Sequence, residues 1–181
     1  MLASSITENT IFMEIPLRTI LFLILPFFFI ACQQQPHQMT PQEKDAAKKE
    51  IAGIVDGIVR SCDQLDYQGA LKPYYDSPSF VAVNTDGSVV DYEGFKSLNT
   101  ELFKAASSFK FNTTKVDVHF LADNVVLCTW TGNSEIGLKS GEHFRTPAFA
   151  ATLLFSKVNS EWKITYSHES ASLPTKETPV K

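Results

Sequence analysis

His168 is the side chain in this sequence best placed for acid–base chemistry. It lies near the end of a strand predicted from Trp162 to Ser170, after a turn at Asn159 and Ser160. An imidazole has an ordinary pKa of about 6.5, so it can act as a general acid or base near neutral pH. The alternative is a histidine at a strand end that only hydrogen-bonds a neighbouring carbonyl.

Side-chain alternation along this strand groups His168 with Trp162, Ile164 and Tyr166 on one face. That face is apolar at its start and polar at its end, as expected where a strand leaves a hydrophobic core at the mouth of a cavity. Glu169 is predicted to point to the opposite face. The two neighbours therefore form no acid–base pair unless a β-bulge intervenes.

Aromatic side chains supply a second kind of candidate, the wall of an apolar pocket with a few polar tips. The predicted ligand-binding residues are Tyr75, Phe80, Trp130, Tyr166 and His168. For any aromatic residue in a sheet the alternative is simple core packing, which we assign to Trp162. A small, largely apolar molecule is the ligand that such a wall would suit.

An apolar run near the N-terminus predicts an export signal. The run from Ile20 to Ile30 follows Arg18 and falls short of the length, about 20 residues, that a membrane-spanning helix needs. Its end, Phe29-Ile30-Ala31-Cys32, resembles a bacterial lipobox, in which a small residue precedes a cysteine that is lipidated. A plain signal peptide and an uncleaved anchor are the alternatives.

The lipobox interpretation sets the expected domain boundaries and the location. Residues 1–31 would be the signal peptide, with Met13 as an alternative start, and Cys32 would carry the lipid. The polar stretch 32–40 lacks periodicity and predicts a flexible tether. The domain would cover residues 41–173 and a disordered tail residues 174–181. We expect a lipid-anchored protein of the bacterial cell envelope, on the outer membrane facing the periplasm.

Composition is that of one ordinary globular domain. The chain has 181 residues, of which 44% are hydrophobic and 20% are charged, enough for one core. Its sixteen Lys and Arg residues are scattered among twenty acids, for a net charge of −4. This balance argues against a nucleic-acid-binding protein.

Two further cysteines, Cys62 and Cys128, fall in apolar patterns and are predicted to be buried free thiols. A disulfide between them is the alternative, since an exported protein meets an oxidising compartment. No Cys or His spacing typical of zinc ligands is present, so no metal and no cofactor are expected.

The remaining chain predicts three helices, a small hairpin and four long strands. The first helix, Pro41 to Asp63, begins with Thr40 as N-cap and carries one apolar stripe. The others are a helix from Asp66 to Tyr75, a hairpin around Asp86-Gly87, a helix capped by Asp91, and strands at Phe111–Leu121, Val125–Gly132, Phe144–Val158 and Trp162–Ser170. The order favours an α+β domain in which a curved antiparallel sheet wraps against the long first helix.

This order of elements is similar to that of the nuclear transport factor 2-like superfamily, and most similar to its SnoaL-like and ketosteroid-isomerase-like branch. The resemblance rests on Tyr74-Tyr75-Asp76 before the hairpin and on Glu161-Trp162-Lys163-Ile164 before His168-Glu169-Ser170. It implies a cone-shaped fold with a cavity between sheet and helices. Ketosteroid isomerases carry an aspartate base after the first short strand, but the matching segment here, Phe80 to Asn84, holds no acid.

Segments that are apolar on both strand faces indicate that a second surface of the sheet is covered. The clearest is Ala148 to Phe155. Because the superfamily commonly dimerises sheet to sheet, we expect a homodimer packed through Phe149, Leu153 and Phe155.

Three functions are compatible with these features. The first is a membrane-tethered envelope lipoprotein whose cavity binds a small molecule without catalysis. The second is a cofactor-independent isomerase, cyclase or dehydratase that uses His168 with a tyrosine. The third is a structural or accessory module of the envelope.

Overall fold

The computed structural model describes residues 38–177, and all structural statements below refer to that part of the chain. The predicted signal peptide, the predicted lipidation site at Cys32 and most of the predicted tether lie outside the described residues. The described residues belong to one compact unit. No helix within residues 38–177 combines the length and apolar character that crossing a bilayer requires.

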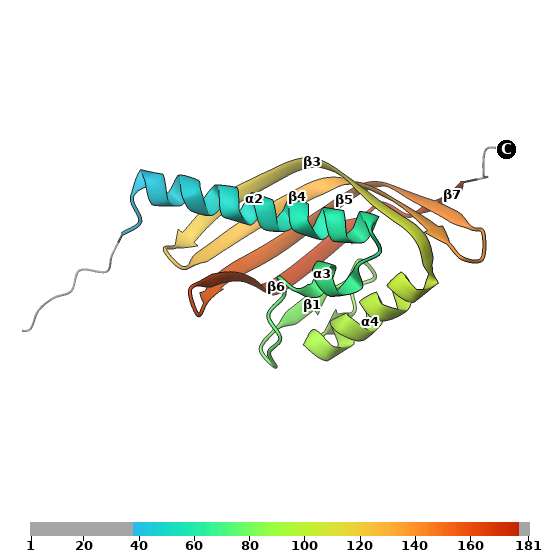
Figure 1. Cartoon of the computed structure of the whole chain (residues 1–181), viewed down its shortest axis with the longest axis horizontal. Coiled ribbons are helices and arrows are strands. Elements are labelled where there is room, and N and C mark those ends of the chain that lie inside the picture. Colours follow the sequence, from blue (N-terminus) through green and yellow to red (C-terminus); the bar gives the residue numbers. More distant parts are fainter. Residues whose placement is uncertain (1–37, 178–181) are drawn as a thin grey trace, which may run out of the picture. The chain divides into compact units, whose positions relative to one another are not determined.

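The long helix α2, Pro41–Asp63, begins and ends as the sequence predicts. Thr40 forms a capping box, in which its Oγ1 accepts from the Glu43 backbone N–H at 3.2 Å and the Glu43 carboxylate accepts from the Thr40 N–H at 2.7 Å. The buried stripe of α2 consists of Ala47, Ile51, Val55, Ile58 and Cys62. Helix α2 lies along the sheet (Figure 1), and its stripe belongs to the same hydrophobic core as the sheet residues Val126 and Leu153.

Two shorter helices follow. Helix α3, Tyr67–Leu71, is shorter than predicted, because Pro73 has no backbone N–H with which to continue the helical hydrogen-bond pattern. Helix α4, Tyr92–Ala105, begins at Asp91, whose carboxylate accepts from the Gly94 N–H at 2.9 Å.

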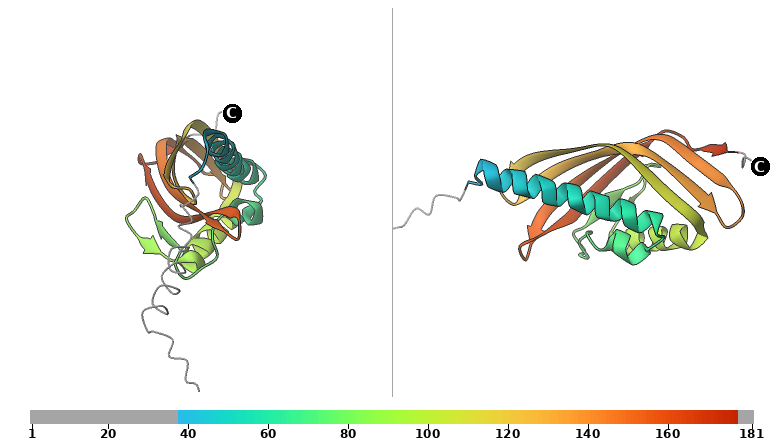
Figure 2. Two further views of the ribbon diagram at one scale, coloured as in Figure 1. Left: turned by 90° about the vertical axis from the view of Figure 1, so that its left-hand side faces the viewer. Right: turned by 45° about the horizontal axis from the view of Figure 1, so that its top comes forward.

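The strands form one seven-stranded sheet in the order β2-β1-β6-β5-β4-β3, with β7 also paired to β5. Their bounds are β1 Val81–Val83, β2 Val89–Val90, β3 Ala106–Ala122, β4 Val125–Leu138, β5 His143–Val158, β6 Glu161–Ala171 and β7 Thr175–Glu177. Figure 2 shows the four long strands curving together, with α2 across their inner face.

The sheet differs from the prediction in two respects. It is mixed, because β1 joins its edge parallel to β6, with Val81 opposite Tyr166. In addition, residues 175–177 of the predicted disordered tail form β7, in which Lys176 lies opposite Phe144 of β5. The three helices and the four sequential antiparallel strands are confirmed.

The hydrophobic core lies on the inner face of the sheet, and three residues of β5 that were predicted to form a dimer contact belong to it. Leu153 and Phe155 are 1% and 0% exposed and pack inside the domain. Phe149 also faces inward, with its ring centroid 5.0 Å from that of Trp130. The error arose because β5 is apolar on both faces, so its pattern does not say which face is inside.

Cys62 and Cys128 are both buried and free, as expected. Burial raises the pKa of the Cys62 thiol to about 12, and the negative charge of Asp63 adds to the effect. The pKa of Cys128 is raised to about 11, again chiefly by burial. Both thiols are therefore protonated at neutral pH and behave as small apolar side chains.

Candidate active site

A β-bulge in β6 decides which residues face the interior. Tyr166 lies opposite Leu154, whereas Ile164 lies opposite Phe155, so Thr165 is the extra residue. The Thr165 hydroxyl donates to the Leu154 carbonyl at 3.3 Å.

Because the bulge adds one residue, each side chain of β6 after Thr165 points to the face opposite to the one predicted by simple alternation. Before it, Trp162 and Ile164 point into the core, as predicted. After it, Ser167 is buried at 1% exposure, and Glu169 lies opposite the buried Ala151. Glu169 therefore points inward, to the face on which His168 was expected.

His168 is exposed and lies opposite Thr152 on the outer face of the sheet. Tyr166 shares that face, opposite Leu154. The structure thus corrects the placement of both residues at the cavity mouth. The alternation that grouped them with Trp162 is interrupted at Thr165.

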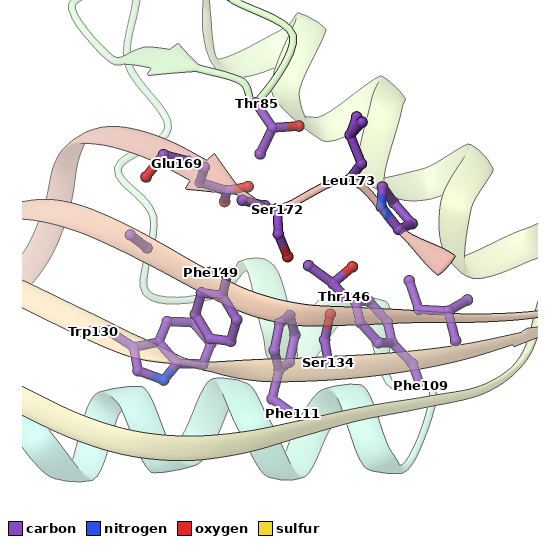
Figure 3. A pocket seen from close by; sticks show the side chains of 15 residues that line it. Thr85, Phe109, Phe111, Trp130, Ser134, Thr146, Phe149, Glu169, Ser172 and Leu173 are labelled. Carbon is purple, nitrogen blue, oxygen red and sulfur yellow. The ribbon is translucent and has the colours of Figure 1, made fainter. Parts of the chain in front are cut away.

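The inner face of the sheet holds a cavity of about 310 Å³. One wall is aromatic and is formed by Phe109, Phe111, Trp130 and Phe149. Figure 3 shows Glu169 and Thr85 across the cavity from these rings. Ser134 and Thr146 add hydroxyl groups, so the cavity is an apolar space with a few polar groups, typical of a small-molecule site.

The C-terminal segment after β6 closes one side of this cavity, which residues 172–174 line. The Ser172 hydroxyl accepts from the Ala148 N–H at 3.1 Å, and the Ser172 N–H donates to the Ala148 carbonyl at 2.9 Å. Further along, Lys176 contacts Glu142 at 2.8 Å. These contacts attach the segment to β5 beside the cavity.

A second, inner chamber of about 120 Å³ lies against the three helices. Tyr74, Cys62 and Asn99 contribute its polar atoms. The two chambers have four lining residues in common, which are Phe109, Phe111, Trp130 and Glu169. The Glu169 side chain therefore stands where the outer cavity adjoins the inner chamber.

The electrostatics of this junction favour neutral groups. Burial raises the pKa of Glu169 above its ordinary value of 4.5. Burial also raises the pKa of Tyr74, and the negative charge of Glu169 contributes to that shift. Within the described residues, neither chamber is lined by Lys, Arg or His. The Tyr74 hydroxyl thus remains a hydrogen-bond donor, and Glu169 has no cation beside it among the lining residues.

Comparison with protein families decides what kind of domain this is. The model of the SnoaL-like domain matches residues 51–174. The chain belongs to the SnoaL-like family. A comparison with curated proteins gives no significant match.

Solved structures share the fold of this SnoaL-like domain. A type 2 hexachlorocyclohexane dehydrochlorinase, LinA, aligns with a TM-score of 0.67 at 10% identity, over 78% of this chain and 95% of its own. A proposed scytalone dehydratase from Novosphingobium aromaticivorans DSM 12444 gives 0.68 at 6% identity, over 78% and 94%. A nuclear transport factor 2-like protein from Salmonella enterica serovar Typhimurium LT2 gives 0.62 at 18% identity, over 72% and 94%. At these identities the similarity establishes the fold.

Of the five predicted ligand-binding residues, Trp130 lines both chambers of the SnoaL-like domain. Its indole N–H donates to the Thr113 hydroxyl at 3.0 Å, which fixes the ring orientation. Phe80 is buried behind Tyr74, with ring centroids 5.9 Å apart, and supports the inner chamber from outside. Tyr75 lines a separate open groove.

The five predicted ligand-binding residues do not include Glu169 and Tyr74, the two polar residues at the centre of the site. Tyr74 lies in the conspicuous pair Tyr74-Tyr75, but the chain turns there and only Tyr74 points inward. Glu169 was assigned to the wrong face. The sequence does show a carboxylate at the polar end of an otherwise apolar strand. The face of the sheet to which this carboxylate points can be assigned only when the bulge is known.

The raised pKa of Glu169 predicts a pH-dependent loss of stability. Below pH 4.5 the carboxyl is protonated in both folded and unfolded chains and contributes nothing. As pH rises, the unfolded chain ionises first, so the native state is destabilised increasingly until the raised pKa is passed. We expect Glu169→Gln to raise the free energy of unfolding at pH 7 and to have little effect below about pH 4.

Urea unfolding at several pH values would measure this difference. The exposed Glu135 offers a matched control, and Glu135→Gln should show no such pH-dependent gain. Equal effects of the two substitutions at every pH would contradict burial of the Glu169 carboxyl.

Proposed function

We propose that this SnoaL-like domain is a cofactor-independent enzyme that removes a proton from carbon, as an elimination catalyst or an isomerase, with Glu169 as the base. The observation that carries the proposal is the position of Glu169, an acid of raised pKa that faces aromatic rings at the junction of two chambers. A carboxylate of raised pKa is a stronger base than an ordinary carboxylate, and is therefore better suited to take a proton from carbon.

The proposed reaction needs no electron acceptor. The Glu169 carboxylate takes a proton from a carbon made acidic by a neighbouring electron-withdrawing group. The electron pair of the broken C–H bond forms a double bond, and the adjacent carbon releases its leaving group with the bonding electron pair. This group is a halide ion or a hydroxide ion, and the hydroxide takes the proton from Glu169 to form water. In an isomerisation the proton would instead return to a different carbon. Tyr74 would donate a hydrogen bond to the group on which negative charge develops.

The folds of the structural relatives support this choice of reaction class. Two of them are named as a dehydrochlorinase and a proposed dehydratase, and both names describe eliminations. The sequence offers His168 no acid partner, which argues against catalysis by that residue. Glu169 removes that objection, since the candidate base is a carboxylate inside the cavity.

A substrate panel tests the proposal. It would contain chlorinated cyclohexanes, β-hydroxy ketones and a β,γ-unsaturated cyclic ketone, with chloride release, loss of water and conjugated-enone absorbance as readouts. Turnover of at least one member is expected. Binding of panel members without any turnover would instead support a ligand-binding protein.

We also propose that the domain is tethered to the envelope through a lipid on Cys32, on the strength of the lipobox resemblance. Cys32→Ala is expected to abolish incorporation of labelled fatty acid and to release the protein from membranes, because one sulfur carries the thioether-linked lipid. Membrane fractionation and palmitate labelling would measure both effects. Cys62→Ala, at a buried thiol, is the matched control. Unchanged membrane retention of Cys32→Ala would contradict the proposal.

The homodimer remains a proposal, now assigned to other residues. The outer face of the sheet carries Leu127, Thr152 and Leu154, each half-buried without a partner subunit. If two copies pack through this face, Leu154→Arg should convert a dimer to a monomer, because it places a charge at an apolar contact. Light scattering at micromolar concentration measures the mass, and a monomeric unmodified protein would overturn the proposal.

A further inference from the structure

We propose that each of the two chambers binds a different part of one substrate. The inner chamber binds a compact, uncharged apolar group of about six non-hydrogen atoms, and the outer cavity binds a larger part. The bond that reacts then lies between the two parts, beside Glu169. This inference rests on the proposed function, and it adds the substrate class and a residue that determines specificity, Leu102.

The sizes of the chambers set the sizes of the two parts. The inner chamber has a volume of about 120 Å³ and the outer cavity about 310 Å³. An engineered apolar cavity of about 150 Å³ in another protein accepts benzene. The inner chamber is therefore suited to a group slightly smaller than a benzene ring, such as a five-membered ring.

The walls of the inner chamber select against charge. Ile58, Leu71, Leu102 and Phe103 supply apolar surface from three helices. The amide of Asn99 already donates to the Phe95 carbonyl at 2.9 Å. The remaining polar groups are the Tyr74 hydroxyl, the protonated Cys62 thiol and, at the junction with the outer cavity, the Glu169 carboxyl. An anionic group would find no cation in this wall, whereas a neutral oxygen could accept from Tyr74.

The boundary between the chambers is a stack of rings that limits what passes. Phe111 lies between Phe109 and Trp130, with centroid distances of 4.8 Å and 5.0 Å. Gly132 lets the Asn112 backbone and the Phe149 ring approach β4 closely. A Cβ at this position would lie 2.3 Å from the Asn112 carbonyl oxygen and 3.1 Å from the Phe149 ring. Packing on both sides holds the rings, so the boundary position is set by the fold.

Leu102 is the residue through which the inner chamber can be enlarged. It is half-buried at the helical wall, whereas Phe103 beside it is 8% exposed and packs on both Tyr67 and Phe109. Leu102→Ala therefore widens the chamber while leaving those ring contacts in place. Leu98 lies on the same helix, is 52% exposed and lines neither chamber, so Leu98→Ala is the matched control.

The test uses two neutral probes, cyclopentanone and 2-naphthol, with the full chain in phospholipid nanodiscs and methyl NMR signals as reporters. In the unmodified protein cyclopentanone should shift the Ile58 and Leu71 methyl signals, and 2-naphthol should shift only that of Ala151. Leu102→Ala should let 2-naphthol shift the Ile58 signal and bind about tenfold more tightly, while Leu98→Ala changes neither.

Two results would overturn the inference. One is a shift of the Ile58 methyl signal by 2-naphthol in the unmodified protein. The other is the lack of any inner-chamber shift with cyclopentanone.

Glu169→Gln separates this inference from the proposed function. If the probes sort as expected but panel turnover survives Glu169→Gln, the role of Glu169 as base is wrong and the two-chamber assignment stands. If Glu169→Gln abolishes turnover but the probes do not sort, only the two-chamber assignment falls.

Discussion

Glu169→Gln is expected to lower turnover of any accepted substrate by about 10²- to 10⁴-fold, the usual contribution of a positioned general base. Gln has nearly the same shape as Glu but cannot take up the proton. The substitution also leaves a neutral group where burial already raises the pKa of the carboxyl, so the fold should be retained. Turnover on the substrate panel, with ligand affinity measured in parallel, separates lost chemistry from lost binding.

His168→Ala is the matched control, because the two residues are adjacent in β6 and point to opposite faces. We expect nearly full turnover from this variant, since His168 lies on the outer face. A larger loss with His168→Ala than with Glu169→Gln would restore His168 as the catalytic candidate. It would also show that the face exchange at Thr165 does not hold in solution.

The helices of this domain are predictable from sequence because their ends are encoded locally. The Thr40 and Glu43 capping box fixes the start of α2, and Asp91 fixes the start of α4. These signals involve residues three positions apart and need no knowledge of the sheet. The end of α3 also follows from a local rule, since Pro73, which lacks a backbone N–H, is expected to kink or break the predicted helix from Asp66 to Tyr75 near its end.

The site is less predictable because it depends on pairing between distant residues. The register of β6 against β5 decides which face Glu169 occupies. In this register Thr165 has no direct partner. Nothing adjacent to Thr165 in the sequence marks a bulge. The cavity walls likewise come together from separate elements, with Tyr74 after α3 and Trp130 in β4. Residue type indicates that such groups can do chemistry, but tertiary pairing decides whether they meet.

Strand β5 is a second case in which the sequence does not show which face of a strand lies inside the domain. Seven of the eight residues 148–155 are apolar, so the sequence predicts that both faces are covered. It gives no sign of which alternate set lies inside. Leu153 and Phe155 were assigned to a subunit contact, and the structure places both in the core.

Phe155→Ala is therefore expected to destabilise the domain by about 3–5 kcal/mol, the usual cost of removing a fully buried phenyl ring. Its side chain is 0% exposed, and the surrounding β-sheet cannot collapse freely to fill the space left behind. Small domains have total stabilities of about 5–15 kcal/mol, so a large part of the population would be unfolded or close to unfolding. Urea unfolding followed by tryptophan fluorescence measures the change directly.

Leu154→Ala distinguishes a core role from a subunit contact, because it removes a neighbouring apolar side chain on the opposite face of β5. If the dimer proposal holds, Leu154→Ala should weaken association and, where the dimer dissociates to folded monomers, make the unfolding midpoint less dependent on protein concentration. Phe155→Ala should instead lower the free energy of unfolding by an amount that does not depend on protein concentration, as long as the oligomeric state is unchanged. If Phe155→Ala altered only the mass in solution and left monomer stability intact, Phe155 would lie at an interface, contrary to its position in the core.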